Sequence, residues 1–376
     1  MPLLYTARES DTMMRILPIV LLLQVSHFRF AFGFSRYSQS ARESSYSCPR
    51  HSFLRLSSTS PSDHVAMGME TSSHSQDDGA ITFTTPPMQV YIEDTDAYGI
   101  MYNSNYLRSF DRALHMTTTK YNNNNMGNRD GTNAAYPISG NHEGWSIVSV
   151  ANQRFGASPT LGQEFLIQGQ LQRQQDTEEV WDMQLQSLDG SIVYNTVKDL
   201  KIQVGNGDDS STIHSSLANI PPFDMATIQP STIRPPDHFP VYRDEIDAHW
   251  QGHLPLRNVL NLFERSRSNA LGGPEALRRL EQDPIHPVII VVTSITDLTL
   301  VDEGTFLLPG QVVAVETAMV VKRKGMVIEC YQTLRSTSSS SARLAQGKVS
   351  LMMLDAKSRR PTTKLPDWVK TLLQIS

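Results

Sequence analysis

Residues 90–110 read VYIEDTDAYGIMYNSNYLRSF, and residues 241–263 read VYRDEIDAHWQGHLPLRNVLNLF. Each stretch opens with Val-Tyr, has an aspartate at its seventh position (Asp96 and Asp247) and ends on phenylalanine. The second stretch is two residues longer, and the extra residues follow its aspartate. An internal duplication explains this similarity most simply, and it predicts two domains with the same fold.

One amphipathic helix is expected early in each copy, because apolar residues recur there at the spacing of a single helix face. These residues are Tyr106, Leu107, Phe110, Ala113 and Leu114 in the first copy, and Leu256, Val259, Leu260, Phe263 and Ala270 in the second. Asn103 suits an N-cap, and Pro255 suits the first turn of a helix. Residues 272–274, Gly-Gly-Pro, form a strong stop signal after the second helix.

Four strand-like segments follow each helix. They are residues 145–155, 164–171, 180–187 and 191–204 in the first copy, and 288–300, 311–321, 326–335 and 344–354 in the second. Hairpin turns are expected at residues 188–190 and 323–325, which both end in glycine. Each copy therefore has the order strand, helix, four strands, which predicts an α+β unit with an antiparallel sheet wrapped around one long helix.

A proline-rich connector separates the copies. Proline disfavours both helix and central strand, so an extended linker is predicted over residues 207–237. The predicted domains span residues 86–206 and 238–356, and a C-terminal tail covers residues 357–376.

The first 80 residues have the composition of a targeting segment. Residues 1–60 contain seven arginines against three acidic residues, and the apolar run at residues 16–25 is too short for the ~20 residues of a membrane span. Residues 33–62 hold eleven serines and one acidic residue. This arrangement resembles the two-part presequences of complex plastids. We predict a presequence and disordered leader over residues 1–80, with a plastid destination, or alternatively a mitochondrial or secretory one.

Composition excludes several classes of function. The net charge of −5 gives no overall attraction to nucleic acid or anionic membrane, and no later stretch is apolar enough to span a bilayer. The two cysteines, Cys48 and Cys330, exclude a disulfide scaffold and a cysteine-based zinc site. No metal or cofactor is expected.

Residues 93–102, EDTDAYGIMY, followed by Asn105, Tyr106, Leu107 and Phe110, resemble the opening of the 4-hydroxybenzoyl-CoA thioesterase family of hotdog proteins. The similarity is greatest to the YbgC-like acyl-CoA thioesterases, and the second copy ends in the same manner at residues 344–349. The resemblance implies a tandem hotdog with active sites at the seam between the halves. YbgC-like members usually carry a histidine where this chain has Asn103, and other branches of the family manage without it.

A thioester carbonyl needs a nucleophile, or a base for water, on one side and hydrogen-bond donors for its developing oxyanion on the other. By resemblance, Asp96 is the catalytic carboxylate, which attacks the carbonyl directly as a nucleophile or activates water as a base, although an aspartate before a helix is also a common turn or cap residue. A strand-end carboxylate followed by a helix start would also place amides beside it. Oxyanion binding is assigned to the backbone of Gly99, Ile100, Met101 and Tyr102, with Asn103 adjoining.

The second copy offers a different pair. Asp247 corresponds to Asp96, but Gly252 is shifted and His253 precedes the second helix, so Asp247 and His253 could exchange protons. The alternative is a capping or surface histidine.

Three further residues are secondary candidates. Asp111 and Glu264 align with each other, and each could position water or form a salt bridge. Tyr91 could line an acyl site or pack on the core.

The main expectation is a lipid-metabolic hydrolase that cleaves thioesters of coenzyme A or acyl carrier protein, without nucleic-acid partners. Two alternatives remain: a hydratase or dehydratase that uses Asp247 and His253, and a non-catalytic hotdog module for binding or assembly. Formation of homo-oligomers is left open.

Overall fold

The computed structural model describes residues 81–96, 99–125, 145–175, 177–204, 220–246, 253–301, 307–338 and 342–375. The predicted presequence, Asp247 and Gly252 lie outside these residues. No helix in the described ranges is long and apolar enough to cross a membrane.

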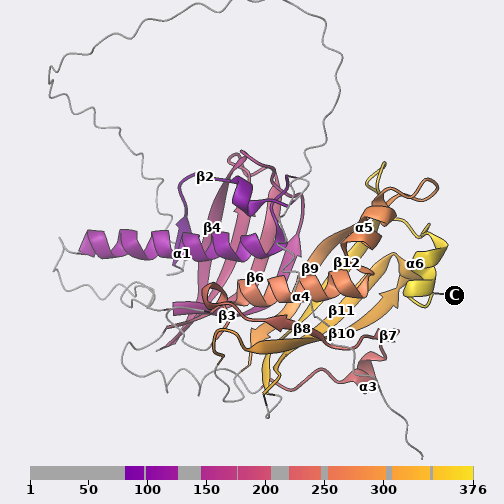
Figure 1. Cartoon of the computed structure of the whole chain (residues 1–376). Helices are drawn as coiled ribbons and strands as arrows, with labels where there is room; N and C mark the ends of the chain where they lie inside the picture. Colours follow the sequence, from indigo (N-terminus) through magenta and orange to yellow (C-terminus); the bar gives the residue numbers. More distant parts are fainter. Residues whose placement is uncertain are drawn as a thin grey trace, which may run out of the picture. The chain divides into compact units, whose positions relative to one another are not determined.

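One antiparallel sheet of twelve strands forms the centre of the protein (Figure 1). The first half contributes β1 (Thr82–Thr84), β2 (Met88–Gln89), β3 (Trp145–Phe155), β4 (Glu164–Gln174), β5 (Glu178–Gln186) and β6 (Val193–Val204). The second half contributes β7 (Thr232–Ile233), β8 (Asp237–Pro240), β9 (Val288–Leu300), β10 (Val312–Lys322), β11 (Val327–Ser336) and β12 (Arg343–Asp355). All eight predicted strands that follow the helices are therefore confirmed.

The two halves have the same strand order and meet at their equivalent strands. The order runs β4-β5-β6-β3 in the first half and continues as β9-β12-β11-β10 in the second. β3 and β9 pair antiparallel from Ser149 opposite Thr299 to Arg154 opposite Ser294. The sheet is thus continuous across the duplication, as Figure 1 shows.

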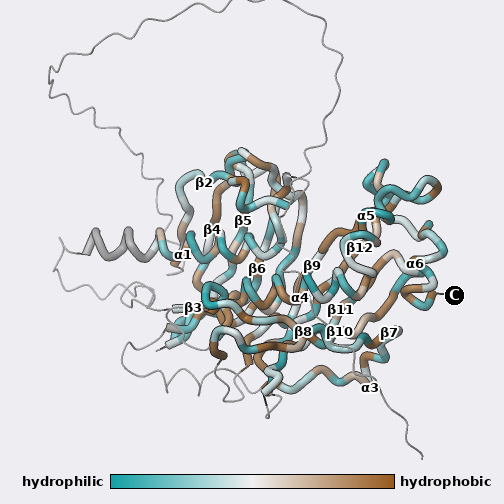
Figure 2. Tube along the Cα trace, viewed as in Figure 1, coloured by the Kyte–Doolittle hydropathy of each residue, from teal (hydrophilic) through white to brown (hydrophobic). Residues whose placement is uncertain are grey.

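Two long helices, α1 (Asn103–Asn125) and α4 (Leu256–Ala270), lie on one face of the sheet and contact each other (Figure 1). α4 also contacts β3, β9, β10 and β11. Every apolar residue predicted for the two helix faces is buried. In Figure 2, hydrophobic and hydrophilic residues alternate along the strands, as expected for a sheet with one covered face.

A strand precedes each long helix, as predicted, but it is short and ends before the aspartate. β2 pairs with β4 and β8 pairs with β10, and two 3-10 helices, η1 (Ile92–Asp94) and η3 (Arg243–Glu245), follow these strands. The backbone N–H of Tyr91 donates to the Asp94 carboxylate at 3.2 Å, and that of Tyr242 donates to Glu245 at 3.0 Å. These local side-chain bonds compete with pairing to a neighbouring strand.

A second helix in the second half was not predicted. α4 ends at Ala270, as the Gly-Gly-Pro signal indicated, but α5 (Gly273–Glu281) begins within that signal. Gly272 has a φ of 98°, which reverses the chain, and proline is well tolerated in the first turn of a new helix.

The connector and the tail contain short elements. α3 (Met225–Ile228) is one helical turn, and β7 and β8 are extended and pair with β10 at the sheet edge, so the helical turn α3 is the departure from the extended linker predicted for residues 220–237. Residues 207–219 of the predicted linker lie outside the described residues. In the tail, α6 (Asp367–Leu372) buries Val369.

Phe263 of α4 is completely buried, so truncation to alanine would leave a cavity. We expect Phe263→Ala to lower the free energy of unfolding by about 3–5 kcal/mol, measured by equilibrium denaturation. Leu188→Ala is the control, because Leu188 is 46% exposed and its loss should cost no more than about 0.5 kcal/mol. Equal losses for the two variants would contradict the described packing of α4.

Candidate functional site

The first-half aspartate, Asp96, sits in a closed turn directly before α1. Its backbone N–H donates to the carbonyl of Ile100 at 2.9 Å, and its carboxylate Oδ1 accepts the N–H of Ile100 at 3.3 Å. Gly99 has a φ of 72°, a left-handed conformation in which glycine avoids strain. The carboxylate is therefore fixed seven residues before α1 starts, but it follows a 3-10 turn rather than a strand.

The amides predicted as oxyanion donors all have acceptors within the protein. Gly99 and Ile100 donate to Asp96, Met101 donates to Pro159 at 2.9 Å, and Tyr102 donates to Asp94 at 2.8 Å. An oxyanion would have to compete with these bonds. By contrast, the first amides of an α-helix have no acceptor inside the helix.

Asp94 is a structural residue. Its side chain is 2% exposed and lies 3.6 Å from Arg108 and 3.8 Å from Arg112. The second half repeats this ion pair, with Arg265 at 3.7 Å from Glu245. Each pair fastens the 3-10 turn to the helix that follows.

Two tyrosines lie within electrostatic range of Asp96: Tyr102, directly before α1, and Tyr106, within α1. Burial raises the pKa of Tyr106 well above its usual value, and the charge of Asp96 raises it further. The pKa of Tyr102 is also raised, first by burial, then by Glu264, and to a smaller degree by Asp96. Both phenols therefore stay protonated at neutral pH and can donate a hydrogen bond.

Glu264 brings the second half to this site. It lies on α4, yet its charge acts on Tyr102 of the first half. Arg267, which is 4% exposed, donates to the Glu264 carboxylate at 2.7 Å and to the Gln332 amide oxygen at 2.7 Å. Gln332 is itself buried and donates to the carbonyl of Phe263. A buried network thus holds Glu264 in place at the seam.

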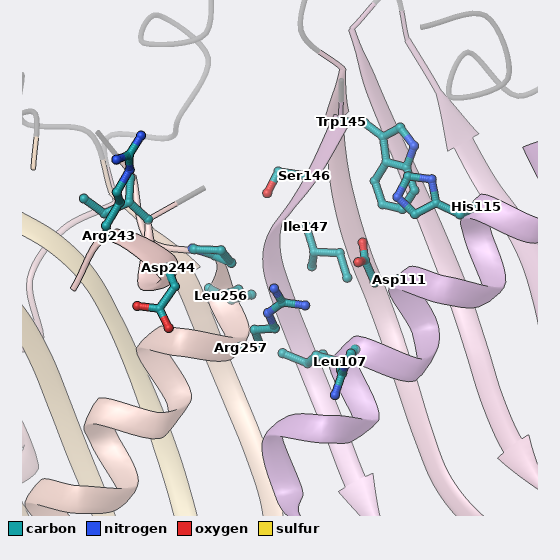
Figure 3. A pocket seen from close by; sticks show the side chains of 13 residues that line it. Leu107, Asp111, His115, Trp145, Ser146, Ile147, Arg243, Asp244, Leu256 and Arg257 are labelled. Carbon is teal, nitrogen blue, oxygen red and sulfur yellow. The ribbon is translucent and has the colours of Figure 1, made fainter. Parts of the chain in front are cut away.

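A cavity of about 410 Å³ lies at the seam, with α1 and the start of β3 on one side and residues 243–246 and 255–257 of the second half on the other (Figure 3). Figure 3 shows Asp111, His115 and Trp145 on the first-half side of this cavity, and Asp244 and Leu256 on the other. The His115 and Trp145 rings lie 4.4 Å apart, with an angle of 34° between their planes. We call this the seam cavity.

The structure thus separates the sequence-predicted residues into two groups. Asp96 and Glu264 are both within electrostatic range of Tyr102, whereas Asp111 lies in the seam cavity beside the second-half turn. Glu264 of α4 therefore acts on the first-half turn, and Asp111 of α1 lies beside the second-half turn.

The other predicted residues are placed as follows. His253 is buried three residues before α4, but Asp247 and Gly252 lie outside the described residues, so the proposed acid–base pair remains a prediction. Tyr91 is 52% exposed, lies outside the core and does not line the seam cavity. Asn103 is the first residue of α1.

Several residues of these sites were not singled out as functional. Tyr106 was predicted only as a core residue, although its hydroxyl group could have indicated a role in a polar site. Arg267 continues the buried row Val259–Phe263 at four-residue spacing, so a charged residue on that face could have been noticed. His115 and Trp145 carry no comparable sequence signal, because their contact depends on the fold.

The described residues contain no cluster of three or more histidine, cysteine, aspartate or glutamate side chains that could hold a metal ion. Cys330 is buried, and burial raises its thiol pKa to about 12, so a reactive thiolate is disfavoured there.

No protein-family model and no curated protein matches the chain. Among solved structures, the chain is similar to an acyl-ACP thioesterase from Bacteroides thetaiotaomicron, with 11% identity, a TM-score of 0.45, and coverage of 73% of this chain and 98% of the other. A 12:0-ACP thioesterase from Umbellularia californica has 9% identity and a TM-score of 0.43, with coverage of 73% and 94%. A 1,4-dihydroxy-2-naphthoyl-CoA thioesterase from Synechocystis has 12% identity and a TM-score of 0.31, with coverage of 37% and 94%.

The raised pKa of Tyr106 predicts how stability depends on pH. Above a pH of about 10, the unfolded chain releases the tyrosine proton while the folded protein retains it, so the free energy of unfolding falls as the pH rises. This contribution is complete below the unfolded pKa and is lost above it. We expect Tyr106→Phe to reduce the fall between pH 9 and pH 11 by about 1.4 kcal/mol, measured by denaturation at both pH values. An unchanged fall would show that Tyr106 ionises as readily in the folded protein.

Proposed function

We propose that this chain is an acyl thioesterase built from two hotdog domains in tandem, at residues 86–206 and 238–356. The observation that carries the proposal is the placement of Asp96: a carboxylate fixed by the Ile100 N–H in a turn before a helix, within electrostatic range of two protonated phenols, one of which is also in range of Glu264 of the other half. The resemblance of residues 93–102 to hotdog thioesterases supports the same reaction.

In this proposal, Asp96 accepts a proton from a water molecule that attacks the thioester carbonyl. The N–H of Ile100 orients the Asp96 carboxylate, and Glu264, held by Arg267, positions the water from across the seam. The tetrahedral intermediate then collapses, the carbon–sulfur bond breaks, and the thiolate takes up the proton. The products are a carboxylic acid and the free thiol of coenzyme A or acyl carrier protein.

The oxyanion of that intermediate needs donors that the protein does not already use. The amides of Gly99 to Tyr102 are engaged, so we assign this role to the first-turn amides of α1, at Asn103 and Ser104, together with the Tyr102 hydroxyl. This chain has Asn103 where YbgC-like proteins usually carry a histidine. The proposed mechanism therefore uses no imidazole at that position.

The first half is the better candidate for the active half. The residues that align with Tyr102 and Tyr106 in the second half are Pro255 and Val259, which carry no hydroxyl group. Organelle import through residues 1–80, with a plastid as destination, and assembly into homo-oligomers are also part of this proposal.

The test is release of free thiol from a panel of acyl-CoA and acyl-ACP thioesters. We expect Asp96→Asn to lower kcat/KM by about 100-fold or more, because the general base is lost. Glu264→Gln should lower it by about tenfold, because the water loses an orienting group but not its base.

The matched control is Glu93→Gln, which removes an exposed carboxylate three residues from Asp96. It should retain kcat/KM within about twofold. Full thiol release by Asp96→Asn, or no release by the unaltered protein with any thioester, would contradict the proposed function.

A further inference from the structure

Gln332 of β11 is the centre of a chain of buried polar side chains beneath α4. Its side chain is completely buried, and its amide oxygen accepts a hydrogen bond from Arg267 at 2.7 Å. Its amide nitrogen donates to the carbonyl of Phe263 at 2.9 Å and to the Thr317 hydroxyl at 3.0 Å. Arg267 in turn donates to the Glu264 carboxylate at 2.7 Å. The Gln332 amide is therefore one side chain away from Glu264.

The chain continues in the other direction to the edge of the sheet, where it ends on Asp237 of β8. The hydroxyls of Thr317 and Ser266 lie 2.9 Å apart, and Ser266 donates to the Asp237 carboxylate at 2.7 Å. We call the whole chain the α4 relay. From the sheet edge inwards, its members are Asp237, Ser266, Thr317, Gln332, Arg267 and Glu264.

The two ends of the α4 relay fix the direction of every hydrogen bond between them. An ionised carboxylate only accepts hydrogen bonds, and a guanidinium only donates them. Because Ser266 gives its proton to Asp237, it accepts from Thr317. Thr317 then accepts from the Gln332 amide nitrogen, which leaves the amide oxygen to face Arg267. A single orientation of the amide satisfies both ends, and it holds the guanidinium in one place.

The fold itself does not require this relay, because the first half has apolar residues in the corresponding layer. The residues of α1 that align with Ser266 and Arg267 are Ala113 and Leu114. β5, which corresponds to β11 in strand order, has buried apolar residues at its middle: Trp181, Met183 and Leu185. Buried charged groups commonly cost stability relative to apolar residues of similar size. A buried arginine at this position in only one copy therefore indicates a role other than folding.

We propose that Gln332 is a positioning residue for the proposed hydrolysis, held by the α4 relay so that Arg267 presents Glu264 to the Asp96 site. The Glu264 side chain is 31% exposed, so it turns towards water when the guanidinium loses its place. This role rests on the proposed function. It extends the site to the buried strand β11, which does not touch the substrate.

The first measurement is release of free thiol by the full chain carrying Gln332→Met, which removes the amide and keeps the length of the side chain. We expect kcat to fall by about tenfold, as for Glu264→Gln, with KM unchanged, because the substrate still binds while the attacking water loses its orientation. In the double variant Gln332→Met/Glu264→Gln, kcat should be no lower than in Glu264→Gln alone, because both substitutions remove the same effect.

The matched control is Gln346→Met. Gln346 is also buried, accepts from Arg343 at 2.8 Å and donates to the Pro221 carbonyl at 3.3 Å. It lies on the opposite face of the sheet, because Gln332 is paired with Gly347 and side chains alternate along a strand. Both variants should lose stability towards denaturant to a similar degree, but only Gln332→Met should lower kcat.

An ultraviolet titration of Tyr102 gives a second readout, which does not require hydrolysis of a thioester. Gln332→Met removes no charge, so a change in the ionisation of Tyr102 reports movement of the charged groups around it. The pKa of Tyr102 is raised by burial and then by the charge of Glu264, so we expect it to fall when Glu264 turns away. The same titration with Tyr102→Phe isolates the contribution of this residue.

The proposal is overturned if folded Gln332→Met keeps the kcat of the unaltered protein while Glu264→Gln loses it, or if the two effects multiply in the double variant. It is also overturned if Tyr102 titrates in the same way with and without the Gln332 amide. Absence of thiol release by the unaltered protein would instead contradict the proposed function, whereas an unchanged titration contradicts only the role of Gln332.

Discussion

The pairing of β3 with β9 is the constraint on which the other features depend. It joins two copies of the same unit edge to edge and makes one antiparallel sheet. Because α1 and α4 lie on the same face of that sheet, the pairing also brings the helices into contact. Each turn that precedes a helix then faces the helix of the other copy. The surroundings of the Asp96 turn and the seam cavity both result from this arrangement, in which each half contributes a helix to the site of the other.

Much of the fold could be predicted from the sequence, because alternating apolar residues specify strands and four-residue spacing specifies the helix faces. β3 and β9 have the predicted bounds, and the predicted core residues of α1 and α4 are buried. The elements that were missed have sequence signals that are compatible with more than one local structure. Gly-Gly-Pro ends α4 and begins α5, and the Asp94 side chain closes a 3-10 helix between the short strand β2 and α1.

The site was harder to predict than the fold. Asp96, Tyr102 and Glu264 were each singled out from the sequence, but nothing in the sequence showed that Glu264 belongs with the first-half turn. That partnership is an electrostatic interaction between Tyr102 and Glu264, which are more than 150 positions apart, and it is set by strand pairing rather than by local pattern. The roles of Arg267 and Gln332 were hidden for the same reason.

Duplication also explains why the two seam sites differ. A single copy that pairs with itself must use one sequence for both sites, whereas a tandem chain can change each site separately. Here the first-half turn keeps two phenols beside Asp96, and the second-half turn has proline and valine at those positions but arginines around its cavity. The division of labour proposed above follows from that freedom.

The most direct test of the account is an ultraviolet titration of tyrosine ionisation at alkaline pH, comparing the unaltered protein with Glu264→Gln, Tyr102→Phe and the double variant. The account predicts that Glu264→Gln lowers the pKa of Tyr102, because the Glu264 charge of the second half raises it, and that Glu264→Gln has no such effect when residue 102 is phenylalanine. An unchanged titration in Glu264→Gln, or the same change with and without Tyr102, would contradict the claim that each half completes the site of the other.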